Sequence, residues 1–271
     1  PAPYPPVPQQ SAEQSTAQST AQPTHQSAEW NRGAYLVTGL GHCGACHTPR
    51  NALGAEQGGS AFLSGAWVDA WEAPALTMLS QAPLPWSSDA LFQYLRHGHS
   101  AEHGMATGPM APVVKELTAL PDADIRAMAV YLASFQSQTT ASPDATAIVA
   151  QAARAAQLKP DALGSGQRLF ESACGACHHD GNGPRLLGLN TPLALSSKLH
   201  SQHPDNLLHT ILHGIQQPVA GDAGFMPAFK SSLSNAQLAD LLGYMRQRFA
   251  PDKPAWDNVR AALGRVREVQ P

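Results

Sequence analysis

The chain has 271 residues with 22 glycines and 23 prolines, and only 14% of its residues are charged and 6% aromatic. This length suggests about two domains, and the composition predicts loop-rich domains in which protein side chains alone would form thin cores. The net charge of −3 excludes a nucleic-acid-binding protein, which needs a basic surface, and no run of about 18 apolar residues is present to form a membrane-spanning helix.

Composition divides the chain into five segments. Residues 1–27 are rich in Pro, Gln, Ser and Thr and can bury too little apolar surface to fold, so a disordered head is expected. A start at Pro1 without Met is expected of a processed or truncated product. A first domain, a linker, a second domain and a helical tail are predicted to follow at residues 28–138, 139–160, 161–250 and 251–271.

The two predicted domains repeat one plan. Each has a first helix, a cysteine motif, a long loop, a short helix, a second loop and a last helix. Gly33 and Gly166 lie on the first helices, where the missing side chain would let each cross the last helix closely, against Tyr131 and Tyr244. In the linker, the Ala-rich residues 145–156 favour a short helix.

All four cysteines lie in two copies of the motif Cys-Gly-Ala-Cys-His. This spacing is typical of c-type haem attachment, in which each thiol adds to one vinyl group and the following imidazole binds the iron. A zinc site would need four grouped ligands, but the motifs are about 130 residues apart, and a thioredoxin-type pair gives no role to the adjoining histidine. The predicted cofactors are two covalent c-type haems, with thioether cysteines Cys43, Cys46, Cys174 and Cys177 and iron ligands His47 and His178.

Methionine is the expected sixth ligand of each iron. Met226 lies just before the last helix of the second domain and Met110 lies at the equivalent place in the first, with Met105 as the alternative. Met128 and Met245 fall on the apolar stripes of the last helices, so core packing is predicted for them. The competing histidines upstream of these methionines are His97, His99, His103, His200, His203, His209 and His213.

The proximal histidines also need a partner for their second ring nitrogen. A ligating imidazole usually donates its other N–H to a carbonyl or a carboxylate. The loops at Pro49 and Pro184 follow the motifs closely and are candidates for that carbonyl. His42 and His179 flank the motifs and are expected to make packing or propionate contacts.

Helix-end signals bound the last helices and the tail. Ser234 and Gln237 match a capping box, and Pro121 with Asp122 suits a helix start. The tail has apolar residues at near-helical spacing, namely Trp256, Val259, Leu263 and Val266. This stripe is expected to pack on the chain itself, with partner contact at the arginines Arg260, Arg265 and Arg267.

These motifs carry a specific resemblance. Residues 32–37, 41–51, 63–67 and 108–110 resemble the cytochrome c subunits of bacterial membrane-associated dehydrogenases, and the resemblance extends over about residues 28–268. It implies an all-α fold of two tandem class I cytochrome c domains, loop-rich and each wrapped around a covalent haem. Such subunits typically have three haem domains, and here the Pro/Gln-rich head stands where the first would be.

The family serves alcohol, gluconate, sorbitol and fructose dehydrogenases and molybdenum hydroxylases. The resemblance therefore implies a partner dehydrogenase subunit of flavin, quinoprotein or molybdenum type, and a quinone or a terminal oxidase downstream. The chain would carry single electrons without catalysis, in the periplasm because covalent haem is attached outside the cytoplasm, with at most peripheral membrane contact. The alternative is an enzyme of the di-haem cytochrome c peroxidase type, which needs an open iron; two methionines at matched positions argue against it.

Overall fold

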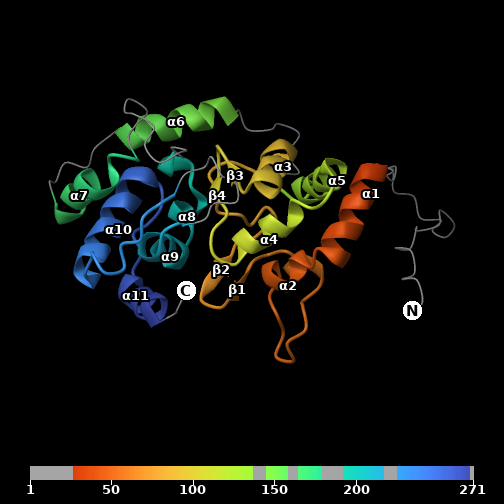
Figure 1. The fold of residues 1–271 in the computed structure, drawn as a ribbon, viewed down its shortest axis with the longest axis horizontal. Coiled ribbons are helices and arrows are strands. Elements are labelled where there is room, and N and C mark those ends of the chain that lie inside the picture. The colour runs from red at the N-terminus through yellow and green to blue at the C-terminus, as the bar shows by residue number, and fades with distance from the viewer. Residues whose placement is uncertain (1–26, 137–144, 158–163, 179–191, 217–224, 269–271) are drawn as a thin grey trace, which may run out of the picture.

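The computed structural model describes residues 27–136, 145–157, 164–178, 192–216 and 225–268. Residues 1–26 of the predicted head, and the predicted contacts at His179 and Pro184, lie outside these ranges. Helices and loops dominate the described residues, whose strands form two short antiparallel hairpins, and none of their helices is long and apolar enough to cross a membrane. Buried apolar side chains form one cluster in each half of the chain, as the two-domain prediction requires. The helices of the two halves are arranged as Figure 1 shows.

The elements of the first half surround the first cysteine motif. In chain order they are α1 (Ala28–Tyr35), the π-helical turn η1 (Leu36–Leu40), α2 (Cys43–His47), the 3-10 turn η2 (Gly59–Ala61), β1 (Ala66–Val68), β2 (Trp71–Ala73), α3 (Ser88–His97), β3 (His99–Ser100), β4 (Gly104–Met105), α4 (Met110–Leu117) and α5 (Asp122–Ala133). β1 pairs with β2 and β3 pairs with β4, so two small hairpins interrupt an otherwise helical arrangement.

The second half repeats this order with fewer elements described. After α6 (Ala145–Gln157), which confirms the predicted linker helix, they are α7 (Ser165–Leu169), the π-helical turn η3 (Phe170–Cys174), the 3-10 turn η4 (Leu193–Leu195), α8 (Ser197–His200), α9 (Asp205–His213), α10 (Asn235–Phe249) and α11 (Val259–Glu268). The predicted short helices are α3 and α9, and a glycine with positive φ follows each of them, Gly98 at 77° and Gly214 at 68°.

A close helix crossing organises each half. α1 crosses α5 at Gly33, where a Cβ atom would lie 2.0 Å from a backbone carbonyl oxygen of α5 and 2.8 Å from the Cβ atom of Tyr131. α7 crosses α10 at Gly166, where the corresponding distances are 2.1 Å to a carbonyl oxygen and 2.9 Å to the Cβ atom of Tyr244. Only glycine permits backbones this close, so both predicted crossings and their tyrosine partners are confirmed.

The predicted ends of the last helices are also confirmed. The Ser234 hydroxyl accepts from the Gln237 N–H, and the Gln237 side-chain oxygen accepts from the Ser234 N–H, which completes the capping box of α10. α5 begins after Pro121, and Asp124 in its first turn forms an ion pair with Arg32 of α1 at 2.8 Å. The first and last helices of the first half are therefore joined by charge as well as by packing.

The tail packs back on the second half, as predicted. Leu263 and Val266 of α11 are buried in the second core, and Trp256 packs against it. Two of the arginines also make contacts within the chain: Arg265 pairs with the fully buried Asp205 at 2.8 Å, and Arg267 donates to backbone carbonyl groups. These two side chains help to hold the tail in place.

We expect Gly166→Ala to lower the free energy of unfolding of the haem-loaded chain by about 3 kcal/mol, since the added methyl group overlaps the backbone of α10. The matched control is Gly243→Ala, at an exposed position of α10 where a Cβ atom meets nothing within 4 Å. That variant should be neutral or gain up to about 1 kcal/mol of helix propensity. Equal melting temperatures for the two variants would contradict the close crossing.

Truncation after Asp252 should lower the melting temperature of the chain purified alone, because it removes α11 from the second core. Leu263→Ala isolates this effect and should cost about 3 kcal/mol, typical of a buried Leu-to-Ala change. Arg260→Ala, on the exposed side of α11, should change stability by less than about 0.5 kcal/mol. An unchanged melting temperature of the truncated chain would show that α11 is a free docking segment.

Candidate haem sites

The first cysteine motif lies on the short helix α2. Cys43 and Cys46 are partly buried free thiols, and the turn into α2 is made by His42, which is exposed and has a φ of 49°. Burial raises the pKa of the Cys43 thiol to about 11, so the thiol is protonated at neutral pH. No group of three or more His, Cys, Asp or Glu side chains able to hold a metal ion is found among the described residues.

The imidazole of His47 is fixed by a hydrogen bond from Nδ1 to the carbonyl oxygen of Pro74 at 2.7 Å. A carbonyl can only accept, so Nδ1 carries the proton and Nε2 has a free lone pair. Burial lowers the pKa of His47, which also favours the neutral ring. The prediction that the Pro49 carbonyl accepts from His47 is wrong, because the Pro49 carbonyl accepts from the N–H of Gln57 instead.

The second motif follows the same local plan. Cys174 is the last residue of η3, and its carbonyl accepts from the N–H of His178 at 2.8 Å, so the motif closes into a helical turn. Burial raises the pKa of the Cys174 thiol to about 11, as at Cys43. A π-helical turn lies just before the first motif and ends at the first cysteine of the second, a feature for which helical spacing in the sequence gives no signal.

The two candidate methionines of the first half occupy different local structures. Met110 is the first residue of α4 and packs, partly buried, against the first core, as Met226 packs against the second. Met105, however, pairs with His99 just after the end of α3, and Met226 pairs with Ile215 just after the end of α9. Core packing thus favours Met110 and strand pairing favours Met105, so the repeat alone does not rank them.

A hollow lies beside Met226. It has a volume of about 490 Å³ and is lined by Leu212, His213, Gln216, Phe225, Pro227, Ala228 and Lys230. Most of the lining is apolar, and its polar groups come from His213, Gln216 and Lys230. The two thiols and the adjoining imidazole of each motif are donors that fit a covalently attached haem.

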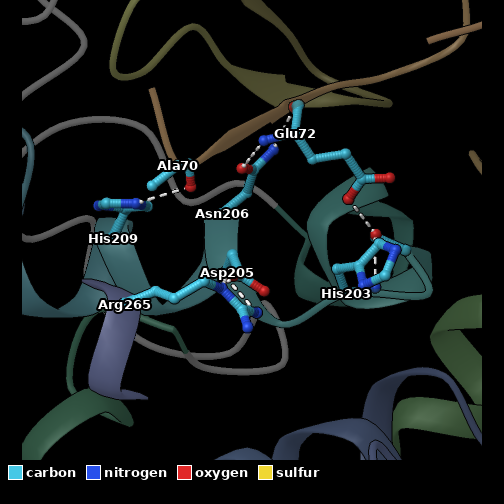
Figure 2. A network of polar contacts seen from close by, with 8 residues as sticks. Ala70, Glu72, His203, Asp205, Asn206, His209 and Arg265 are labelled. Atoms are coloured by element: carbon cyan, nitrogen blue, oxygen red, sulfur yellow. Dashed lines mark hydrogen bonds and ion pairs between the residues drawn. The ribbon is translucent and has the colours of Figure 1, made fainter. Parts of the chain in front are cut away.

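The two halves meet at the β1–β2 hairpin, which lies against α9 (Figure 1). The side-chain amide of Asn206 accepts from the N–H of Glu72 at 2.9 Å and donates to its carbonyl at 2.7 Å. His209 Nε2 donates to the carbonyl oxygen of Ala70 at 3.1 Å, and the Glu72 carboxylate accepts from the hydroxyl of Ser201 (Figure 2). The two domains are therefore joined by direct contacts as well as by the linker between them.

Two family models match the chain. Residues 31–136 match the model described as cytochrome c, and residues 161–245 match the model described as cytochrome c oxidase, cbb3-type, subunit III. By these models the chain contains two cytochrome c domains, one in each half. The predicted fold class is therefore confirmed, and c-type haem is the covalently bound cofactor of these domains.

Similar proteins are named as components of dehydrogenases. A nicotinate dehydrogenase subunit of Pseudomonas putida is 52% identical over 242 residues, which are 89% of this chain and 20% of that protein. The fructose dehydrogenase cytochrome subunit of Gluconobacter japonicus is 36% identical over 246 residues, 82% of this chain and 49% of the relative. The gluconate 2-dehydrogenase cytochrome c subunit of Pantoea cypripedii is 39% identical over 256 residues, with coverages of 88% and 54%.

These relatives confirm the predicted resemblance to dehydrogenase cytochrome subunits, which are electron-transfer components and not catalytic ones. The chain spans about a fifth of the nicotinate dehydrogenase protein and about half of the other two relatives.

The contact between the two cytochrome c domains should weaken in acid through His209. Burial lowers the pKa of His209, and the nearby His213 lowers it further. The hydrogen bond to the Ala70 carbonyl and the charge of Asp205, which pairs with Arg265, act in the opposite direction and raise the pKa. Because the folded pKa lies below the unfolded value of 6.5, the unfolded state binds more protons as pH falls below about 6.5, and stability is lost there.

We therefore expect the free energy of unfolding to fall between about pH 7.5 and pH 5.5, and His209→Phe to reduce that slope while keeping a ring at the contact. Denaturant unfolding at each pH measures it. His97→Phe, at an exposed histidine of α3 that does not lie at the domain contact, is the control for replacing a histidine ring by phenylalanine. An equal slope in all three proteins would exclude His209 as the group responsible.

Proposed function

We propose that this chain is a periplasmic electron carrier with two haems, one in each cytochrome c domain. The observation that carries the proposal is the duplicated motif, in which two free thiols adjoin a histidine and, in the first copy, a carbonyl holds that imidazole in the tautomer that can bind iron. When bound, a c-type haem supplies an iron that gains and loses one electron at a time.

We assign the attachment and ligand roles residue by residue. Cys43 and Cys46 hold the haem of the first domain, with His47 as its proximal ligand. The corresponding residues of the second domain are Cys174, Cys177 and His178. Met110 and Met226 are the sixth ligands, which would close both irons to substrates and suit electron transfer better than peroxide chemistry. The domain boundaries that follow are residues 28–138 and 161–250.

The partner is proposed from the names of the relatives. The nicotinate, fructose and gluconate dehydrogenases named above oxidise different substrates, so the shared role is to receive electrons from a catalytic subunit of flavin, quinoprotein or molybdenum type. A quinone or a terminal oxidase is the acceptor downstream. Covalent haem is attached outside the cytoplasm, which supports a periplasmic location with at most peripheral contact with the membrane.

Single methionine variants of the haem-loaded chain test the ligand assignment. Met226→Ala should convert only the second haem to the high-spin state, and Met110→Ala only the first, because each loses its thioether ligand. Optical spectra that follow the methionine–iron charge-transfer band provide the measurement. Met128→Ala is the control, since this side chain is buried in the first core and should leave both bands in place.

Met105→Ala decides between the two candidates of the first domain. Loss of the first charge-transfer band in Met105→Ala, with the band intact in Met110→Ala, would contradict our assignment and show that strand pairing marks the ligand. A high-spin haem in the wild type together with peroxide turnover would overturn the carrier and favour the peroxidase-like enzyme.

A further inference from the structure

The indole ring of Trp71 lies between the two cytochrome c domains. On the side of its own domain it covers Gly108, where a Cβ atom would lie 2.5 Å from the ring carbons. Gly108 stands between Met105 and Met110, so Trp71 contacts the segment that contains both candidate iron ligands. On the other side the ring stacks on His209 of α9, with centroids 4.2 Å apart and planes 12° from parallel.

The stack continues into the second domain. His209 lies next to His213, with ring centroids 5.7 Å apart and planes 28° from parallel. His213 lines the hollow beside Met226 and precedes Gly214, where a Cβ atom would lie 2.3 Å from the Met226 carbonyl oxygen. Trp71, His209 and His213 thus lie in succession between the methionine segment of the first domain and the hollow near Met226.

The turn that presents Trp71 is held in a strained conformation. Asp69 and Ala70 connect β1 to β2 with φ values of 46° and 64°, in the left-handed region that glycine or asparagine usually fills. The carbonyl of Ala70 accepts the hydrogen bond from His209 (Figure 2), so the second domain contacts the strained residue directly. Strain of this kind persists where surrounding contacts fix the backbone, and it is concentrated at functional sites.

We propose that the stack of Trp71, His209 and His213 couples the two haem centres, and that Trp71 is the positioning residue that holds the domains in the electron-transfer arrangement. The inference rests on the proposed carrier function. In the step that it serves, one electron passes between the domains: one centre is oxidised, the other is reduced, and no bond or proton is exchanged. A packed contact favours this step because it fixes the separation of the two centres.

Other contacts of the same hairpin do not have this arrangement. Trp67 meets the second domain at the edge of His203, with centroids 5.1 Å apart, and at Arg265, and it is 47% exposed. Glu72 bonds to Asn206 through its backbone. These contacts dock the hairpin, whereas Trp71 also contacts Gly108 in the methionine segment. Trp67→Ala is therefore a matched control, because it removes a docking contact of the hairpin and leaves the contact of Trp71 with the methionine segment in place.

The experiment uses the full haem-loaded chain and the variants Trp71→Ala, Trp71→Phe and Trp67→Ala. Flash photoreduction delivers less than one electron per molecule, and absorbance follows its redistribution between the two haems. Both reduction potentials are titrated on the same samples, and small-angle scattering reports the domain separation. If Trp71→Ala leaves the productive arrangement populated about a tenth of the time, redistribution slows about tenfold.

In Trp71→Ala we expect this roughly tenfold slower redistribution, with unchanged reduction potentials and a larger radius of gyration. Trp71→Phe should restore the rate of redistribution, and Trp67→Ala should change that rate by less than about twofold. Unchanged redistribution in Trp71→Ala, or equal slowing in Trp67→Ala, would overturn the coupling role and leave the carrier function standing. Slowing explained by shifted potentials would also overturn it. A wild-type chain whose haems accept no electrons would instead refute the proposed function itself.

Discussion

The contact on which each domain depends is the crossing of its first helix over its last helix at a glycine. The backbones of α1 and α5, and of α7 and α10, approach so closely that even a methyl group at Gly33 or Gly166 would overlap a carbonyl oxygen. The first helix of each domain ends within three residues of this crossing. The π-helical turn and the cysteine motif follow directly, so the position of the thiols and of the histidine is set by a contact that contains no functional group.

A second constraint acts between the domains. The β1–β2 hairpin belongs to the first domain by sequence, yet its turn is held by hydrogen bonds and ring contacts from α9. The carbonyl that orients His47 belongs to Pro74, directly after this hairpin. One segment therefore contacts the first haem motif at one end and the second domain at the other, which links the geometry of the site to the docking of the domains.

Local chemistry explains which features the sequence could predict. The glycine crossings and the capping box at Ser234 depend on residues that repeat or lie three positions apart, and both are confirmed. Pro74 could not be recognised because it contacts His47 from 27 positions away. The stack of Trp71 on His209 joins residues from different domains, and no periodicity marks such a pair. The ligand residues themselves stay predictions from motif and repeat.

The central claim is that two haem domains form one electron carrier. A reductive titration of the purified full chain, combined with haem quantification, tests it most directly. The structure and the duplicated motif lead us to expect two covalent haems per chain, uptake of one electron by each, and spectra of six-coordinate iron throughout. A single haem per chain, or a second haem that stays high-spin and accepts no electron, would contradict the claim.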